Sequence, residues 1–366
     1  MRGIRARCVI GKSCHPDERE ETETRSLYTP EPTTEGRYFK APVFAVAPMI
    51  DWTDRHCRFF HRQLTGRALL FTEMVVADAI LHGNRDRLLG FSAEEHPVAL
   101  QLGGSDPAKL AEAVRIASDY GYDEINLNVG CPSDRVQSGT FGACLMREPE
   151  TVAACVAAIK DVARVPVTVK CRIGVDDQAP ETVLPDFLAH MVAAGADAIW
   201  IHARKAWLQG LSPKENREIP PLDYDLVHRM KRENPDVFLG INGGIDTIEA
   251  ALEHLKVMDG VMLGRAAYHN ATLLTEVDEK IYGAARRVPD FDAVRDTMIA
   301  YAEAVIAGGG RLNHVTRHMI GLFQGFAGAR RYRQILSDAT KPGIGPALIA
   351  EAFAAVDIAG GPKAAA

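Results

Sequence analysis

Eight short runs of apolar and β-branched residues divide the central part of this chain, and stretches rich in Ala and Arg separate them. The runs are VFAVA (43–47), LLFTEM (69–74), PVALQLG (97–103), EINLNVG (124–130), PVTVKCR (166–172), DAIWIHA (197–203), VFLGING (237–243) and DGVMLG (259–264). Such near-continuous apolar runs are typical of strands that are buried on both faces of a parallel sheet. Their midpoints lie about 31 residues apart on average, which leaves room for one helix between successive strands.

This alternation predicts an α/β fold, and eight strand–helix units in roughly 245 residues favour a TIM (β/α)8 barrel. A doubly wound sheet would be expected to carry a G-x-G-x-x-G motif after an early strand, and the sequence contains none. The strand pattern ends after Arg287, and helices are expected over 292–307, 311–326 and 344–356. We therefore expect a barrel domain at 37–284 and a small C-terminal α-helical domain at 285–356.

The two ends of the chain have no such pattern. Residues 1–36 contain six Lys or Arg, seven Asp or Glu and a Thr- and Pro-rich stretch, without a repeating apolar face. We expect a poorly ordered N-terminal extension there and a disordered tail at 357–366.

Hydropathy, cysteine usage and charge exclude several classes of protein. No apolar run of about 18 residues occurs, and the N-terminus lacks the apolar core of a signal peptide, so we expect a cytoplasmic protein without membrane contact. The seven cysteines are irregularly spaced without a C-x-x-C pair, unlike a disulfide framework or a structural zinc site. The net charge of −6 argues mildly against a polyanionic partner, although local charge decides this question.

Polar residues or glycines end nearly every expected strand, where the active site of a barrel lies. Any one of them alone is more often a hydrogen-bonded structural group, but so many together indicate a site. They are Pro48, Met49, Thr72, Glu73, Gln101, Asn126, Asn128, Lys170, Arg172, His202, Arg204, Asn242, Gly243, Gly244, Gly264 and Arg265.

The loops after the last two expected strands indicate a phosphorylated ligand. Gly243, Gly244 and Gly264 allow tight turns whose backbone N–H groups can surround a phosphate, and Arg265 can add a positive charge. Tight turns without a ligand would explain either loop separately. Lys170 lies within a buried strand, where a lysine must reach the surface or meet an anion such as the edge of a flavin ring.

Cys131 differs from the other cysteines because it directly follows an expected strand. It also precedes the glycine-rich stretch 138–142, a candidate mobile lid. A cysteine at this position can be a nucleophile, a metal ligand or an acid. The sequence has no His/Cys/Asp cluster at ligand spacing and no flanking base, which disfavours the metal and the nucleophile. We favour a proton donor.

Six segments of the chain resemble the tRNA-dihydrouridine synthase family, and specifically its A subfamily. They are APMIDWTDR (47–55), NLNVGCPS (126–133), VKCRIG (169–174), IHARKAWL (201–208), GLSPKENR (210–217) and NGGI (242–245). The resemblance extends over roughly 37–356. It implies an FMN-dependent enzyme that uses NADPH to reduce the 5,6 double bond of a uracil in the tRNA D-loop, at positions 20 and 20a.

The resemblance also implies roles for individual residues. Cys131 would protonate C5 of the uracil while reduced FMN delivers a hydride to C6. Asn128 would lie near a uracil that has left its stack, and further tRNA contacts would come from Lys214, Arg217, Arg330 and Arg333. Ten residues would hold FMN, the last five around its phosphate: Pro48, Met49, Gln101, Lys170, His202, Asn242, Gly243, Gly244, Gly264 and Arg265.

A basic stretch near the C-terminus independently favours a nucleic-acid partner. Five arginines and two histidines, but no acidic residue, lie between Ala307 and Leu336. Arg330 and Arg333 would share one face of a helix. We expect a monomer with tRNA and NADPH as partners. Two alternatives remain: an FMN barrel oxidoreductase acting on a small molecule, similar to dihydroorotate dehydrogenases, and a tRNA-binding protein that retains a barrel without redox activity.

Overall fold

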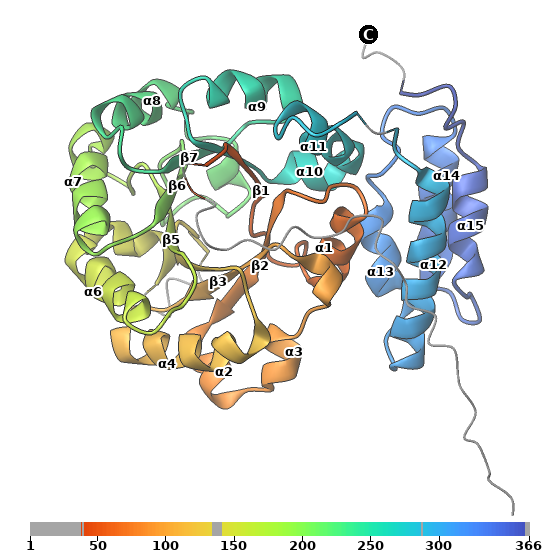
Figure 1. Cartoon of the computed structure of the whole chain (residues 1–366), viewed down its shortest axis with the longest axis horizontal. Helices are drawn as coiled ribbons and strands as arrows, with labels where there is room; N and C mark the ends of the chain where they lie inside the picture. Colours follow the sequence, from red (N-terminus) through yellow and green to blue (C-terminus); the bar gives the residue numbers. More distant parts are fainter. Residues whose placement is uncertain (1–37, 39, 134–140, 287, 363–366) are drawn as a thin grey trace, which may run out of the picture.

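The computed structural model describes residues 38, 40–133, 141–286 and 288–362 of the chain (Figure 1). The expected N-terminal extension, most of the candidate lid and the last four residues of the expected tail lie outside the described residues. No helix within the described ranges is long and apolar enough to cross a membrane.

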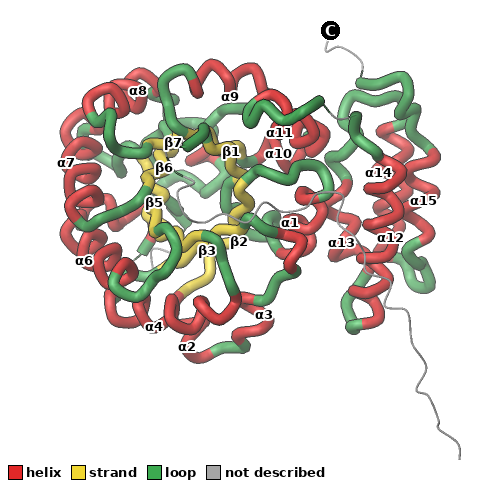
Figure 2. Tube along the Cα trace, in the orientation of Figure 1, coloured by secondary structure: helices red, strands yellow, loops and turns green. Residues whose placement is uncertain are grey.

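Eight parallel strands close into a barrel in their chain order, which confirms the expected fold (Figures 1 and 2). They are β1 (Val43–Val46), β2 (Leu69–Val76), β3 (Val98–Gly103), β4 (Glu124–Val129), β5 (Val167–Arg172), β6 (Ala198–His202), β7 (Leu239–Asn242) and β8 (Gly260–Leu263). Pairing of β8 with β1 closes the ring, from Val43 opposite Gly260 to Val46 opposite Leu263.

Helices form an outer layer around the strands (Figure 2). Asp54 and Asp106 accept backbone N–H groups at the start of α1 and α4, so these helices begin where the sequence offers a capping carboxylate. The helices of this layer are α1 (Arg55–Arg62), α2 (Ala77–His82), α3 (Arg85–Leu89), α4 (Pro107–Ala117), α6 (Pro149–Lys160), α7 (Pro180–Ala193), α8 (Tyr224–Glu233), α9 (Ile248–Leu255), α10 (Arg265–His269) and α11 (Val277–Lys280).

A C-terminal helical region stands beside the barrel, on the side of α1 (Figure 1). It contains α12 (Phe291–Ala307), α13 (Leu312–Met319), α14 (Ala329–Ser337) and α15 (Ala347–Ala354). The helix expected over 311–326 is wrong in length, because it ends at Met319. The chain then turns against α10: Gly321 O accepts the N–H of Ala271, and a Cβ on Gly321 would lie 2.3 Å from Tyr268 O.

Asp54 connects this helical region to the barrel. Its carboxylate accepts hydrogen bonds from Arg317 and His318 of α13, and the His318 ring also contacts the Tyr268 hydroxyl at 3.1 Å. Burial raises the pKa of Asp54, but the hydrogen bond and charge of His318, together with hydrogen bonds from the Cys57 N–H and Arg317, outweigh it and hold the pKa well below its usual range. Part of the basic stretch therefore stabilises the contact between the two parts of the chain.

Two kinds of side chain fill the barrel. One half is apolar and includes Ala45, Phe71, Met262 and the fully buried ring of Trp200. The other half is filled by polar side chains of β4 and β5, whose alternate residues point inward. These inward residues are Glu124, Asn126, Asn128, Thr168, Lys170 and Arg172.

Gly240→Ala is expected to destabilise the apolar half. A Cβ on Gly240 would lie 2.2 Å from the ring of Trp200, which is fully buried. Overpacking of this kind costs about 1–3 kcal/mol, so the urea midpoint should fall. Gly345→Ala is the control, since a Cβ there would meet no atom within 4 Å. Equal midpoints for the two variants would contradict the tight packing of Trp200 on Gly240.

Candidate active site

The carboxyl ends of the strands bring most of the sequence-predicted residues to one end of the barrel. Asn128 pairs with Lys170 across β4 and β5, and His202 pairs with Asn242 across β6 and β7. The remaining members of this cluster lie in or directly after strands of the barrel: Pro48, Met49, Gln101, Cys131, Gly243, Gly244, Gly264 and Arg265. Lys214 and Arg217 lie in the long loop after β6, whereas Arg330 and Arg333 lie on α14, outside the barrel.

Lys170 places a cation inside the mouth of the barrel. Its Nζ donates to Asn242 Oδ1 at 3.0 Å, and Asn242 Nδ2 donates to Met262 O at 2.7 Å. Burial, together with the positive charge of Arg172, lowers the pKa of Lys170 to about 8. No carboxylate of the described residues forms an ion pair with Lys170. The site therefore fits an anionic ligand, which would supply the missing negative charge.

The loop that carries Cys131 is held through its backbone. Asn128 Oδ1 accepts the N–H groups of Gly130 and Cys131 at 3.1 and 3.0 Å, and Arg172 Nε donates to Gly130 O at 3.0 Å. The Cys131 thiol is partly exposed and lies 3.5 Å from the Ser133 hydroxyl. A fixed backbone with an accessible thiol is the arrangement that a proton donor at the barrel mouth requires.

Arg172 has a role that sequence reasoning did not assign. Besides Gly130 O, its guanidinium donates to Lys205 O and Asn216 O, both at 3.0 Å. Burial lowers its pKa to about 10. One buried arginine thus ties the Cys131 loop to the loop after β6. The alternation in VKCR, which puts Lys170 and Arg172 on the same face of a strand, could have revealed it.

The loop after β6 is organised around Asn216, which sequence reasoning also missed. Its side chain accepts the N–H of Trp207 at 2.7 Å and donates to Trp207 O and Leu211 O at 2.8 and 3.1 Å. These bonds leave Lys214 and Arg217 exposed on the surface of the loop. Asn216 therefore holds the loop in place, and the loop carries the charged side chains of Lys214 and Arg217 on its surface.

Gly243, Gly244 and Gly264 form the backbone turns directly after β7 and β8, which we call the glycine cradle. Gly243 has φ +113°, and a Cβ on it would lie 2.5 Å from the His202 ring, so only glycine fits. A Cβ on Gly264 would approach no atom closer than Met49 Sδ, at 3.6 Å. Arg265 donates to Glu218 Oε1 at 2.5 Å. A phosphate in this cradle would therefore compete with Glu218 for the Arg265 guanidinium.

His202 lies between this cradle and Lys170. Burial and the neighbouring charges of Arg172 and Lys170 lower its pKa well below the usual value, so the ring is neutral at pH 7. It can exchange hydrogen bonds with a ligand but does not add a charge.

Comparisons with known proteins identify the family to which this sequence is similar. The sequence model of the family described as Dihydrouridine synthase (Dus) matches residues 45–356. A tRNA-dihydrouridine(20/20a) synthase of Shewanella oneidensis is 56% identical over 315 residues, which cover 86% of this chain and 94% of that protein. Proteins with the same name from Salmonella typhi and Xanthomonas campestris are 54% and 55% identical, covering 88% and 86% of this chain and 98% and 93% of theirs. Among solved structures, morphinone reductase aligns over 69% of this chain and 88% of its own, with a TM-score of 0.47 and 14% identity.

Proposed function

This chain belongs to the dihydrouridine synthase family, a family of flavin-dependent oxidoreductases, and we propose that it uses FMN and NADPH to reduce a D-loop uridine of tRNA to dihydrouridine. The observation that carries the proposal is the pairing of two groups at the mouth. Cys131 lies on a loop whose backbone is held by Asn128, and Lys170 donates to the Asn242 amide but forms no ion pair with a carboxylate of the described residues. Positions 20 and 20a, which the relatives carry in their names, are the proposed targets. We take the enzyme to be a cytoplasmic monomer.

The residues at the mouth fit FMN. Lys170 supplies a positive charge, and neutral His202 supplies a hydrogen-bonding ring. The cradle of Gly243, Gly244 and Gly264 would surround the phosphate, with Arg265 released from Glu218 to bind it. Pro48, Met49, Gln101 and Asn242 complete the proposed FMN-binding set. FMN held there and reduced by NADPH would supply the hydride for C6 of the uracil.

The chain supplies the proton. Cys131 donates it to C5 of the uracil, and the partly exposed thiol is accessible to a base in the mouth. Asn128 holds the Cys131 loop with its oxygen and gives one amide hydrogen to Gln101. Its second amide hydrogen remains for a uracil oxygen. We therefore assign Asn128 both to the Cys131 loop and to the flipped base.

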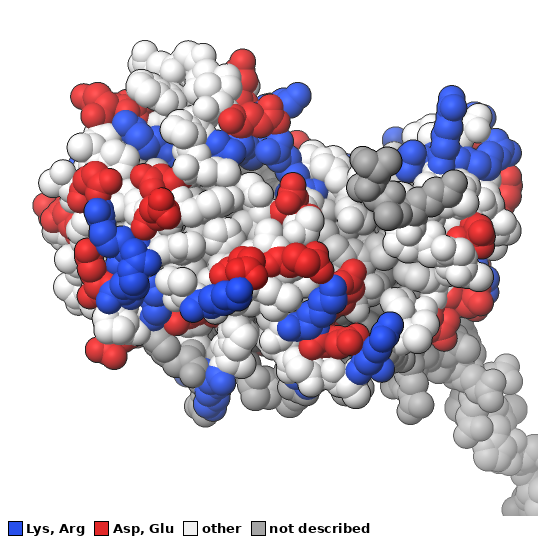
Figure 3. Space-filling model, turned by 90° about the horizontal axis from the view of Figure 1, so that it is seen from above, with Lys and Arg blue, Asp and Glu red and all other residues white. Residues whose placement is uncertain are grey.

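The proposed tRNA surface has two parts. Lys214 and Arg217 lie on the loop after β6, and Arg330 and Arg333 are exposed on α14. Figure 3 shows that Lys and Arg side chains gather at the upper end of the helical lobe, while acidic side chains lie lower on the same lobe. Segregated charge of this kind favours a polyanionic partner despite the net charge of −6.

Arg330→Ala combined with Arg333→Ala is expected to weaken tRNA binding and flatten its salt dependence. Two lost phosphate contacts should reduce the slope of log affinity against log salt by about two. Filter binding between low and moderate salt measures this slope. Arg331→Ala is the control, because Arg331 lies on another face of α14 and bonds Gln334 at 3.1 Å. An unchanged slope in the double variant would place the tRNA elsewhere.

The experiment that tests the function combines spectroscopy with substrate. The purified protein should show a flavin spectrum that NADPH bleaches and that unmodified tRNA restores under anaerobic conditions. A flavin that tRNA does not reoxidise would favour the small-molecule oxidoreductase. A colourless protein that FMN does not reconstitute would leave the tRNA-binding protein without redox activity.

A further inference from the structure

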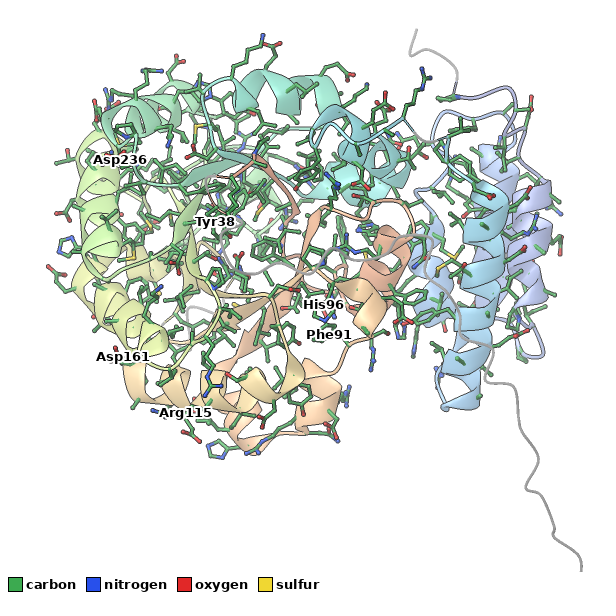
Figure 4. The ribbon with its side chains drawn as sticks, viewed as in Figure 1. Tyr38, Phe91, His96, Arg115, Asp161 and Asp236 are labelled. Carbon is green, nitrogen blue, oxygen red and sulfur yellow. The ribbon has the colours of Figure 1, made fainter. Side chains whose placement is uncertain are left out.

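A continuous chain of hydrogen bonds crosses the polar half of the barrel and ends at the Cys131 loop. It starts at the buried carboxylate of Glu124, near the opposite end of the strands. Tyr38, inside the ring of strands in Figure 4, also donates to this carboxylate. The successive steps are Thr168 Oγ1 to Glu124 Oε1 at 2.5 Å, Asn126 Nδ2 to Thr168 Oγ1 at 2.8 Å, Gln101 Nε2 to Asn126 Oδ1 at 2.8 Å and Asn128 Nδ2 to Gln101 Oε1 at 2.7 Å.

The direction of this chain is fixed at both ends. At the mouth, Asn128 must present its oxygen, because the backbone N–H groups of Gly130 and Cys131 can only donate. At the far end, the Glu124 carboxylate accepts from the hydroxyl of Thr168. Every amide between the two ends then has one orientation that satisfies both neighbours, and reversal of any one would bring two donors or two acceptors together.

These polar groups are fully buried, although apolar side chains would fill the same space at a lower desolvation cost. Glu124, Asn126 and Thr168 are 0% exposed, and Gln101 is 1% exposed. The other half of the same barrel is filled by apolar side chains, which bury without a desolvation cost. The row of buried polar groups on β3–β5 therefore indicates a functional role, and the row ends at the Cys131 loop.

We propose that Glu124, Thr168 and Asn126 are positioning residues, which set the orientation of the Gln101 and Asn128 amides and through Asn128 place Cys131 at the mouth. This inference rests on the proposed function only in that it takes Cys131 to be the acid. The positioning itself is a property of the folded chain.

Thr168→Val tests the hydrogen-bond chain at Thr168, whose hydroxyl connects Asn126 to Glu124. Valine keeps the shape of threonine but removes the hydroxyl, so Asn126 Nδ2 loses its acceptor and its preferred orientation. The buried Asn126 amide then has an unsatisfied donor, and the Gln101 and Asn128 amides are no longer anchored to Glu124. Weaker anchoring of Asn128 should let the Cys131 loop move more freely. Thr168→Ser retains the hydroxyl and is the matched control.

The first measurement does not depend on activity. Cys131 in the full-length protein without tRNA is alkylated with iodoacetamide, and its labelling rate is followed by peptide mass spectrometry well below the thermal midpoint. We expect the rate to change about fivefold in Thr168→Val, because the loop that presents the partly exposed thiol is no longer held in one conformation, and to stay near the wild-type rate in Thr168→Ser. A lower thermal midpoint with an unchanged labelling rate would overturn the proposal.

The second measurement uses the FMN-loaded enzyme. We expect Thr168→Val to lower kcat for tRNA about tenfold and to change KM for tRNA much less, because the proposed phosphate contacts of Lys214, Arg217, Arg330 and Arg333 lie outside the barrel interior. Equal loss in Thr168→Val and Thr168→Ser would also overturn the proposal. If Thr168→Val does not fold, Thr168→Ala replaces it, since alanine also removes the hydroxyl that connects Asn126 to Glu124. If the wild-type protein cannot reduce tRNA but the labelling rate of Cys131 still changes in Thr168→Val, the proposed function is refuted and the positioning role stands.

Discussion

Replacing Cys131 with alanine is expected to lower the rate of dihydrouridine formation by about 10²–10⁴-fold, the range for loss of a positioned general acid. The loop itself should keep its geometry, because Asn128 and Arg172 bind only backbone atoms of Gly130 and Cys131. Folding, FMN content and tRNA affinity should therefore remain near wild-type values, and the defect should be confined to the proton-transfer step.

Stopped-flow absorbance separates the two half-reactions of this variant. Reduction of the flavin by NADPH should proceed at the wild-type rate, and its reoxidation by tRNA should be slow. Cys155→Ala is the control, since Cys155 is a buried cysteine of α6, in the outer layer of helices. Reoxidation at the wild-type rate in Cys131→Ala would remove the acid assignment.

The fold could be predicted from the sequence because each barrel strand is buried on both faces and is therefore written as a nearly continuous apolar run. All eight predicted strands agree with β1–β8 to within two residues at each end. The error in α13 has a different origin. The helix ends because Gly321 must pass close to the backbone of Tyr268, and a contact of that kind between distant segments leaves no periodic pattern in the sequence.

The location of the site could be predicted because a parallel barrel collects its strand ends at one mouth. The roles of Lys170, Cys131 and the FMN-binding residues remain predictions, although the structure places them together. The roles of Arg172 and Asn216 were missed because these side chains hold backbone carbonyls and loops, which depends on the three-dimensional path of the chain.

The hydrogen-bond chain from Glu124 to Asn128 shows most clearly what a single sequence cannot predict. The alternation in EINLNV does place Glu124, Asn126 and Asn128 on one face of β4. Their partners Gln101 and Thr168 lie on neighbouring strands, opposite Asn126 on each side. That pairing depends on the register between strands, which a single sequence does not contain.

Lys170→Met is expected to weaken FMN binding about tenfold to a hundredfold, because a hydrogen bond to a charged group contributes about 1.5–3 kcal/mol. Methionine fills similar space without the charge. It should also leave the FMN-free protein equally or more stable to heat, because a partly buried ammonium without a carboxylate partner among the described residues destabilises the fold. A loss of affinity together with a gain in stability distinguishes a binding residue from a structural one.

The same lysine should make FMN binding depend on pH. Burial lowers the pKa of Lys170 to about 8 in the protein without FMN. Below pH 8 the side chain is already protonated, so binding of the anion needs no proton and the affinity is constant with respect to this group. Above pH 8 the protein must take up a proton on binding, and the affinity should fall by up to about tenfold per pH unit.

Titration of FMN fluorescence between about pH 7 and pH 9.5 measures this dependence, in a range where the other FMN-binding residues change little in charge. Wild-type protein should show the fall above pH 8, and Lys170→Met should bind weakly with no such fall. Lys256→Met is the control, because Lys256 is an exposed lysine that pairs with Glu253 and should retain the wild-type profile. Parallel profiles for wild type and Lys170→Met would show that the anion lies elsewhere in the mouth, since a charge that FMN does not contact cannot link its protonation to binding.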